Sequence, residues 1–332
     1  RGDENDVGRA AGPTALGVKG QLRRSEPDTV TSLDPYLQAS WKLDKWTLQA
    51  GLRHSNVKFD VDDKYVAAGN PDDSGKLSYR KTTPALGILY QLSPTLNLYA
   101  SAGRGFETPT LSELSYSGPG GASGFNFGLE PATSKQFEMG AKAFIGDATR
   151  VNAAIFEIRT DDELVVDSNL GGRTTFKNAA STLRRGLELA ADTEFMRHWR
   201  GRFSLTWLRA IYDQDFEDGK RLPGIPALSA YAEVEWAPRP GLAAAIETSY
   251  RGKVYVEDTN TEHPAPAYAL VNLRLTAEQE SGRWTFGQLL RIDNVFDREH
   301  VASVIVGSAG DRFYEPGPTR SLYAGARASY RF

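Results

Sequence analysis

The strongest constraint in this sequence is an alternation of apolar and polar residues that recurs along most of the chain. Side chains of a β-strand point alternately to its two faces, so a period of two predicts strands with one apolar and one polar face. The pattern recurs in 135–143, 187–191, 203–207 and 284–291. In 46–53 the apolar set is Trp46, Leu48, Ala50 and Leu52, and the opposite set is Thr47, Gln49, Gly51 and Arg53.

Short polar turns and long polar connections separate these segments in regular succession. Residues such as Gly, Pro and Asp favour tight reversals, and most of the short turns contain them. The short turns are predicted at 43–45, 93–95, 146–148, 197–199, 238–241 and 279–282, and the long connections at about 59–79, 105–134, 160–182, 212–227, 252–266 and 295–320.

The segments have the length and number expected of a transmembrane β-barrel. We count about thirteen strands from Ser32 onward and one more at about 14–24, each of roughly 10 to 13 residues, enough for a tilted strand to cross a bilayer. A half-buried sheet in water alternates in the same way, but so many long strands would be unusual there. We therefore predict an all-β antiparallel barrel domain over 1–332, with about 14 strands present.

Composition excludes several other classes of protein. Charged residues make up 24% of the chain, and no apolar run approaches the length of a spanning helix. A net charge of −3 gives no basic footprint, so we expect no nucleic-acid partner. The absence of Cys excludes a disulfide scaffold and thiolate chemistry. The chain begins with Arg1 and shows no signal peptide, so we expect a mature protein or a fragment.

The C-terminal segment sharpens the membrane prediction. Leu322, Ala324, Ala326, Ala328 and Tyr330 alternate with polar or small residues, and the chain ends on the aromatic Phe332. Barrels of the bacterial outer membrane commonly end this way, and the barrel-assembly machinery reads that last strand. We therefore expect an outer-membrane location, with the short turns on the periplasmic side and the long loops outside, against lipid and lipopolysaccharide.

Five segments, in the right order, resemble the signature of TonB-dependent outer-membrane receptors. Two residues depart from the family pattern: Ala132 stands where an acid is usual, and His300 stands where an aromatic is usual. The resemblance covers about 33–332. The segments are 96–114 with Arg104, Phe106 and Pro109; 129–140 with Glu130, Pro131 and Glu138; 176–189 with Asn178, Gly186 and Glu188; 293–301 with Asn294, Phe296 and Asp297; and 316–325, which begins at Pro316.

The resemblance implies a 22-stranded barrel, filled by an N-terminal plug domain and preceded by a TonB-contacting box. About 14 strands and no plug are expected here, so we interpret the chain as the C-terminal part of a receptor for active uptake of a ferric siderophore or similar metal chelate. The contact with the TonB complex would lie in the missing N-terminal region. A complete chain would instead predict a passive, porin-like channel, and a soluble β-rich adhesion protein is a further alternative.

No catalytic constellation is present, and we predict that the protein is not an enzyme. The motifs HExxH, GxSxG, CxxC and the Gly-Lys-Ser/Thr phosphate loop are absent, and His54, His198, His263 and His300 are scattered. The acidic residues of 60–73 could coordinate Ca²⁺, but they lack a recognisable spacing. We prefer a solvated loop that faces lipopolysaccharide.

Ligand binding is more credible on the long loops. The 105–134 loop combines aromatic residues with many glycines, a mixture suited to gripping a small flat ligand. A guanidinium could pair with an anionic ferric chelate, and each candidate could instead serve loop packing. The resemblance implies an alternative role for Arg104 and Glu107, which could organise loop and plug instead of touching ligand. The candidates are Glu107, Tyr116, Phe125, Phe127, Tyr255, Arg312, Phe313 and Tyr314.

The class of ligand is only partly constrained. Haem receptors similar to this chain carry a His in the loop equivalent to 106–130, and none lies there, although His263 and His300 lie in other loops. We therefore expect a ferric siderophore, with cobalamin, haem or a glycan as alternatives. The chelator would hold the iron, so we expect no protein cofactor and no metal-ligating side chains.

Overall fold

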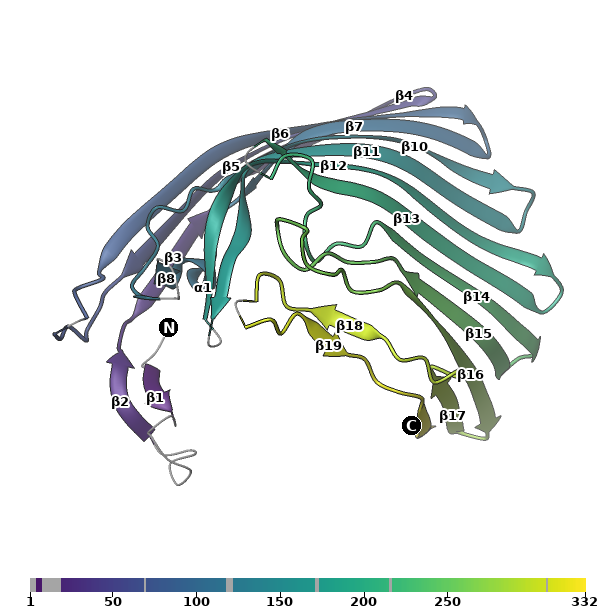
Figure 1. The fold of residues 1–332 in the computed structure, drawn as a ribbon. Helices are drawn as coiled ribbons and strands as arrows, with labels where there is room; N and C mark the ends of the chain where they lie inside the picture. Colours follow the sequence, from purple (N-terminus) through teal and green to yellow (C-terminus); the bar gives the residue numbers. More distant parts are fainter. Residues whose placement is uncertain are drawn as a thin grey trace.

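The computed structural model describes residues 4–7, 19–68, 70–117, 122–170, 173–214, 217–308 and 310–332. One large antiparallel sheet dominates it, and strands that are consecutive in the sequence are neighbours in space (Figure 1). The strands run in the order β20-β17-β16-β15-β14-β13-β12-β11-β10-β7-β6-β5-β3, with β4 also paired to β5. Their bounds are β3 Asp28–Leu33, β4 Tyr36–Leu43, β5 Trp46–Val61, β6 Gly75–Ser93, β7 Leu96–Glu107, β10 Ala132–Ile145, β11 Thr149–Leu170, β12 Arg173–Met196, β13 Trp199–Gln214, β14 Leu228–Arg239, β15 Leu242–Arg251, β16 Tyr268–Ser281, β17 Trp284–Asp293 and β20 Ser321–Tyr330.

Strands β3 and β4 follow one another along the same edge of β5. Pro35 lies between them, and Pro has no backbone N–H to donate to a ladder. The carbonyl oxygen of Pro35 still accepts a hydrogen bond of 2.9 Å from the backbone of His54. The further strand expected at about 14–24 is β2 (Lys19–Arg24), which pairs with β1 (Glu4–Val7) and not with the large sheet; residues 8–18 lie outside the described part.

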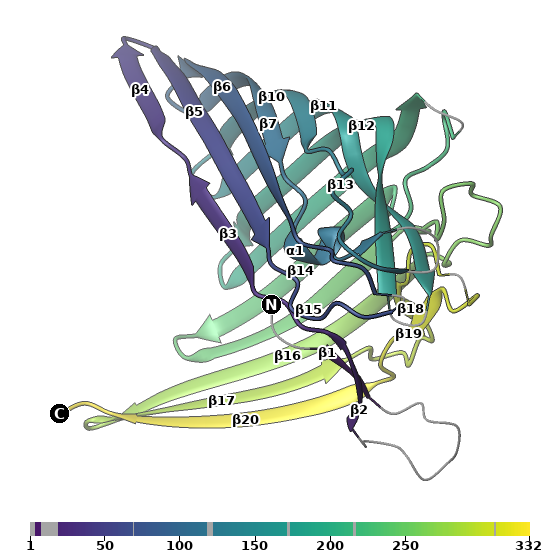
Figure 2. The ribbon, with the colours of Figure 1, turned by 90° about the vertical axis from the view of Figure 1, so that its left-hand side faces the viewer.

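The sheet curves into an open arc (Figure 1). In the described part of the chain, no strand pairs with the outer edge of β20 or with that of β3 and β4. The six predicted short turns are all present and all lie at one end of the strands, while the long connections lie at the other (Figure 2). Left-handed backbone at Asp44, Gly146, His198, Gly241 and Gly282 closes five of the six turns.

The connection predicted at 160–182 differs from expectation, because most of its residues continue β11 and β12 as a long hairpin. The ladder runs on from Thr160↔Thr182 to Leu170↔Arg173, with one irregularity between Val166 and Ser168. Asp162 adopts a left-handed conformation (φ 57) that lets the hairpin change direction as it leaves the sheet. Backbone pairing, which side-chain polarity does not reveal, therefore sets the structure of this segment.

The two faces of the sheet exchange character along β5. Nearer the short turns, the convex face is apolar and the concave face polar; nearer the long loops, the reverse holds. Concave Phe59 is 3% exposed, whereas convex Leu52 is 50% exposed. The convex series is Trp46, Leu48, Ala50 and Leu52, then His54, Asn56, Lys58 and Asp60, and the concave series is Thr47, Gln49, Gly51 and Arg53, then Ser55, Val57, Phe59 and Val61.

The convex apolar series continues from strand to strand, so it forms one band around the arc. Cα partners such as Leu48 and Ile88, Ile155 and Leu187, and Leu290 and Ala324 carry it across the sheet. Its short-turn border is aromatic, as in barrels whose rings lie at a membrane interface. The border holds the ring pairs Trp46–Tyr90 at 4.4 Å, Trp199–Trp236 at 6.2 Å and Trp284–Tyr330 at 5.0 Å between centroids. No helix among the described residues is long and apolar enough to span a membrane.

A chain of ion pairs crosses the concave face over five strands. Arg202 contacts Glu233 at 3.1 Å, and Arg274 contacts both Glu233 (3.1 Å) and Glu247 (3.4 Å). Arg291 contacts Glu247 at 2.8 Å. Glu233 and Glu247 are 4% and 5% exposed, so the arginines compensate carboxylates that would be costly to bury alone. The polar face is thus an ordered wall of paired charges.

Two glycines on the concave face each lie beneath an aromatic ring of the paired strand. Gly140 pairs with Tyr99, and Gly186 pairs with Phe156. A Cβ atom at Gly186 would come within 2.4 Å of the Phe156 ring and 2.8 Å of the Trp207 carbonyl oxygen. This close packing explains why the sequence keeps Gly at position 186.

We predict that Gly186→Ala destabilises the folded sheet by about 1 to 3 kcal/mol, because the added methyl group forces the ring or the backbone to move. The temperature at which heat-modifiable gel mobility is lost should fall. Gly310→Ala is the matched control, since nothing lies within 4 Å of a Cβ atom there. An equal loss in both variants would contradict this explanation.

Candidate functional site

The loop between β7 and β10 folds inward against the concave face (Figure 1). It contains the short helix α1 (Leu111–Leu114) and the strands β8 (Tyr116–Ser117) and β9 (Ala122–Ser123). A capping box starts α1: the Glu113 N–H donates to the Thr110 hydroxyl (3.3 Å), and the Thr110 N–H donates to the Glu113 carboxylate (2.7 Å). Its last residue, Leu114, is fully buried.

A hydrophobic cluster holds this loop in place. Leu114, Phe125 and Leu129 of the loop pack with Phe59 and Tyr79 of β5 and β6. The Tyr79 hydroxyl donates to the Leu129 carbonyl oxygen at 2.6 Å. The loop therefore has its own core, built on the apolar upper part of the concave face.

Asn178 joins this loop to the β11–β12 hairpin. Its side-chain oxygen accepts from the Glu130 N–H (2.9 Å), and its side-chain nitrogen donates to the Glu130 carbonyl (2.8 Å) and the Asp162 carbonyl (2.7 Å). One amide thus satisfies three backbone groups from two segments. This is a structural reason for the Asn of the 176–189 motif.

Four of the connections at the loop end are joined to one another by backbone hydrogen bonds. The Gly307 N–H donates to the Val256 carbonyl at 3.0 Å, and the Gly307 carbonyl accepts from the Asn169 N–H at 3.1 Å. The Gly224 N–H donates to the Tyr255 carbonyl at 2.9 Å. Segments from the β11–β12, β13–β14, β15–β16 and β17–β20 connections therefore form one assembly, which also contains β18 (Val301–Val304) and β19 (Tyr314–Pro316).

The motif at 293–301 shapes the entry to the last of these loops. Asn294 and Asp297 both have left-handed backbone (φ 50 and 54), which Asn and Asp tolerate better than most residues. The Asn294 side chain accepts from the Arg298 N–H at 2.8 Å and donates to its carbonyl at 2.9 Å. The Asp297 carboxylate accepts from the Arg320 N–H at 2.8 Å.

A cavity of about 460 Å³ lies between the β7–β10 loop and the concave face. Arg184 and Glu163 form an ion pair on its wall, and the Thr182 hydroxyl donates to the same carboxylate. Glu107, in contrast, has no hydrogen bond or ion pair to any described residue. The residues that line the cavity are Gly105, Phe106, Glu107, Glu113, Ala132, Ser134, Gln136, Ile158, Thr160, Glu163, Leu164 and Arg184.

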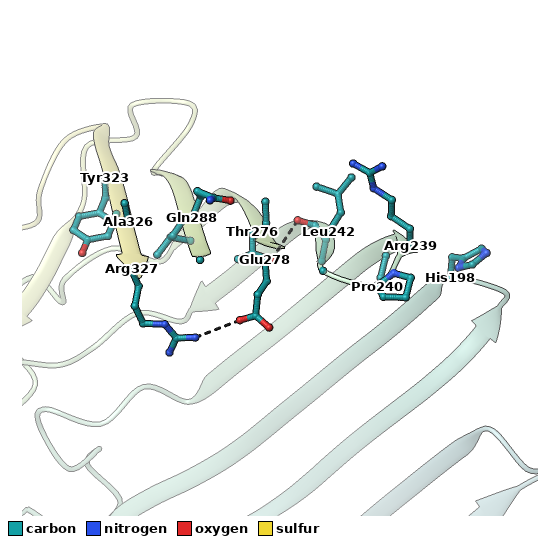
Figure 3. Close-up of a pocket in the computed structure, with 17 residues that line it drawn as sticks. His198, Arg239, Pro240, Leu242, Thr276, Glu278, Gln288, Tyr323, Ala326 and Arg327 are labelled. Atoms are coloured by element: carbon teal, nitrogen blue, oxygen red, sulfur yellow. Dashed lines mark hydrogen bonds and ion pairs between the residues drawn. The ribbon is translucent and has the colours of Figure 1, made fainter. Parts of the chain in front are cut away.

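A larger groove of about 920 Å³ lies at the opposite end of the sheet, beside the short turns (Figure 3). His198 and Arg239 come from two of these turns, and an Arg327–Glu278 ion pair of 3.3 Å crosses it. The groove is open and remote from the long loops. We therefore place the candidate site at the smaller cavity and the joined loops.

The candidate ligand residues fall into three groups: buried, half-buried and exposed. Phe125 and Phe313 are 6% and 7% exposed, and both pack inside the loops. Phe127 is half-buried against the hydrophobic cluster of the β7–β10 loop, and Tyr116 is half-buried. Tyr255 is half-buried under Lys253, whose ammonium lies 5.2 Å from the ring centroid. Glu107, Arg312 and Tyr314 are exposed, and the Tyr314 hydroxyl donates to the His263 carbonyl. Ligand contact remains a prediction for all eight.

The other motif residues have structural surroundings. Pro109 is buried, Phe106 packs against the loop cluster, and Glu138 accepts a hydrogen bond of 2.7 Å from Tyr99. Phe296 is 76% exposed, and Phe332 is fully exposed. Pro316 pairs with Val301, Arg104 lies on the convex face, Glu188 lies on the concave face, and Pro131 is half-buried.

The sequence did not single out Glu163, Arg184 or Asn260. The Asn260 side chain accepts from the Arg221 N–H at 2.6 Å and donates to the Arg221 carbonyl at 2.9 Å, which joins two loops. Partners so far apart in sequence leave no local signal. Only the run of turn-forming residues at 257–263 hinted at a structured connection.

Nothing in the described part of the chain gathers three or more His, Cys, Asp or Glu side chains in a way that could hold a metal ion. The acidic stretch at 60–73 forms internal turns, in which the Asp63 carboxylate accepts from the Tyr65 N–H (2.8 Å) and the Asp73 N–H (3.3 Å). Burial, followed by the neighbouring Asp63 carboxylate, raises the pKa of Asp73.

Comparison with known proteins now assigns the fold to a family. A family model described as "TonB dependent receptor-like, beta-barrel" matches residues 2–295. The chain belongs to the TonB-dependent receptor family. Barrels of this family are outer-membrane proteins of Gram-negative bacteria, which confirms the predicted location, and its members are transport receptors, not enzymes.

The relatives of this TonB-dependent receptor are named after different ligands. It is 24% identical over 296 residues to the metal-pseudopaline receptor CntO of Pseudomonas aeruginosa, which covers 86% of this chain and 39% of the relative. It is 27% identical over 256 residues to the vitamin B12 transporter BtuB of Vibrio vulnificus, covering 74% of this chain and 37% of the relative. The chain thus spans about two fifths of the curated relatives it matches.

A solved structure supports the fold independently. The unliganded ferric citrate transporter FecA superposes with a TM-score of 0.78 at 17% identity, over 96% of this chain and 48% of that chain. At this low sequence identity, the likeness shows only that the two proteins share a fold. The arc of strands is therefore the fold of a TonB-dependent receptor barrel.

We predict that Asn178→Ala frees the β7–β10 loop, because three backbone groups lose their side-chain partner. Folding should lose about 1 to 3 kcal/mol, and hydrogen exchange at the Glu130 amide should accelerate. Asn152→Ala on β11 is the control, since its amide makes no side-chain hydrogen bond to a described residue. Unchanged exchange at Glu130 would contradict the role given to Asn178.

We predict that the β15–β16 loop loosens in acid through Glu257. Burial alone would raise the pKa of this carboxyl, but the Thr259 hydroxyl and the N–H groups of Thr259 (2.7 Å) and Glu262 (3.1 Å) lower it below its ordinary value of 4.5. A lowered folded-state pKa adds stability above pH 4.5 that is lost as pH falls through the folded value.

Hydrogen exchange in 252–267 should therefore be steady from neutral pH down to about pH 5 and faster at lower pH, after correction for intrinsic rates. Glu257→Ala should show the faster exchange already at neutral pH. A variant with the same profile as the unchanged protein would refute the assignment to Glu257.

Proposed function

We propose that this protein is the barrel of a receptor that takes up a scarce metal chelate, most specifically a ferric siderophore, in a TonB-dependent manner. The observation that carries the proposal is the arrangement of the long loops. The β11–β12 hairpin and the β13–β14, β15–β16 and β17–β20 loops join one another through Gly307, Val256 and Tyr255. The β7–β10 loop folds inward and borders a polar cavity against the concave wall. Such an arrangement suits capture of a ligand at the loop end of a barrel.

Exposed polar and aromatic side chains support a chelate as the cargo. Arg312 is exposed and has no hydrogen bond or ion pair to a described residue, and Tyr314, two residues further along the chain, is also exposed. A guanidinium offers a planar pair of donors to carboxylate or catecholate oxygens. The chelator, and not the protein, would supply the ligands to the metal.

The names of the relatives are consistent with a metal chelate as the ligand, but they differ in which chelate is bound. Metal-pseudopaline, ferric citrate and vitamin B12 are all metal-containing ligands in those names. We propose that energy reaches this receptor from TonB through a segment N-terminal to the barrel. A passive channel is the alternative function, and cobalamin, haem or a glycan are the alternative cargoes.

Uptake of labelled ligand tests the proposal in a host that produces the complete receptor. Ferric catecholate, ferric hydroxamate, ferric citrate, haemin and cobalamin would be supplied separately, with and without a functional TonB. We expect saturable uptake of a ferric chelate that stops without TonB. TonB-independent entry with single-channel conductance would establish the passive alternative.

We predict that Arg312→Gln weakens binding of an anionic ferric chelate about 10-fold, because a charge-assisted hydrogen bond is lost. Arg283→Gln removes an exposed cation at a short turn and serves as the matched control. Titration of the purified receptor measures both. Equal affinity for the two variants would remove Arg312 from the site.

A further inference from the structure

The convex face between β7 and β13 carries a compact group of basic side chains. Arg104, Lys135, Arg159, Arg185 and Arg209 come from five adjacent strands, and all five are exposed. We call these five residues the outer basic patch. Their positions are fixed by strand register, because side chains two residues apart on a strand share a face.

The outer basic patch borders the apolar band directly. Arg104, Lys135, Arg185 and Arg209 each lie two residues beyond a band residue of their own strand, on the side of the long loops. The band residues at these places are Ala102, Phe137, Leu187 and Trp207. Two residues of strand correspond to about 6 to 7 Å, which places the cations at headgroup depth beside a hydrocarbon layer.

Cross-strand pairing brings these cations close together. Arg104 is the Cα partner of Lys135, which is the partner of Arg159. Arg185 is the partner of Arg209. Two rows of the ladder thus place like charges beside one another, an arrangement that is unfavourable unless anions are also present.

Carboxylates of the chain neutralise the patch only in part. Glu157 contacts Arg159 at 3.0 Å and Arg185 at 2.6 Å. Asp161 lies 3.7 Å from Lys135, and Asp213 lies 3.6 Å from Arg159. Arg104 and Arg209 have no hydrogen bond or ion pair to any described residue. Five cations therefore face three carboxylates, and two guanidinium groups are left for an external anion.

The patch does not continue past β13. At their loop ends, the convex faces of β14, β15 and β16 present the uncharged residues Leu228, Tyr250 and Ala269. The short-turn border of the band is aromatic. A ligand that needs both hydrocarbon contact and anion pairing would therefore find such a site at the outer basic patch and not on the convex face of β14 to β16.

We propose that the outer basic patch binds the phosphate groups of a phosphorylated glycolipid of the outer leaflet, namely lipopolysaccharide. The long loops of outer-membrane barrels lie on the extracellular side, which puts the patch in that leaflet. Guanidinium forks pair with phosphate in two-point fashion, and the acyl chains would lie against Phe137, Ile155, Leu187 and Trp207. This site is separate from the chelate site, since it lies on the opposite face of the sheet.

The test uses the protein isolated with detergent from the outer membrane in the form that the cell makes. The patch variant combines Arg159→Gln, Arg185→Gln and Arg209→Gln. The control variant combines Lys45→Gln, Arg239→Gln and Arg283→Gln, three exposed cations at the short turns. A third variant replaces the same three patch arginines by Lys, and heat-modifiable mobility verifies folding of each.

Binding of purified lipopolysaccharide is measured by native mass spectrometry and by the lipid that copurifies. We expect at least about a tenfold loss in the patch variant, because each basic residue near an anionic lipid surface adds several-fold to affinity. The control variant should bind as the unchanged protein does, and the Lys variant should bind between the two, because Lys keeps the charge but loses the two-point pairing. Retained binding in the patch variant, or an equal loss in the control, would overturn the proposal.

Two further probes separate the sources of the phosphate. Lipid A stripped of its phosphates should bind the unchanged protein and the patch variant equally weakly. Tight binding of that lipid would assign the site to acyl chains and overturn the proposal. Inorganic phosphate should compete only at concentrations far above those of the glycolipid, and competition at equal concentration would reduce the patch to a general anion site.

Discussion

Backbone hydrogen bonding in a medium without water is the constraint on which this structure depends. A strand in lipid has no solvent to satisfy its N–H and C=O groups, so every group must find another strand. Inside the large sheet this demand is met in the simplest way, because each strand from β5 to β17 pairs with the sheet strands on both sides of it; in the described residues, the outer edges of β20 and of β3 and β4 have no partner strand. Short turns closed by residues such as Gly146 and Gly282 are then enough to connect the strands at one end of the sheet. The long loops all lie at the other end.

The exchange of character between the two faces follows from that demand. Convex side chains must be apolar where they meet hydrocarbon and polar where they meet headgroups, as Leu52 and Lys58 illustrate on one strand. The concave side is released from the first requirement, so it can carry the Glu233–Arg274–Glu247 ion pairs at one level and the Phe59 cluster at another. The same strands therefore contact lipid in the part nearer the short turns and pack against the loops in the part nearer the long loops.

Sequence periodicity predicted the strands, the six turns and the order of loops, because these depend on local patterns. It could not predict that Thr160–Leu170 continues as strand, since polar strand residues outside a membrane resemble loop. It could not predict that Phe125 packs with Phe59 and Tyr79, because these neighbours lie far away in sequence. The 176–189 motif identified Asn178. Its role, two hydrogen bonds to the backbone of Glu130, became clear only from the structure. Glu163 and Arg184 carried no signal, because an isolated Glu and Arg are ordinary surface residues.

The joined loops have a consequence for how such receptors diversify. Gly307 contacts the β15–β16 loop with its N–H and the β11–β12 hairpin with its carbonyl, while Asn260 pairs with the backbone of a third connection. These bonds fix the lengths of segments that are distant in the gene. A loop transplanted alone from a relative would lose its register with the others, so recognition must evolve by coordinated change in several loops rather than by exchange of independent modules.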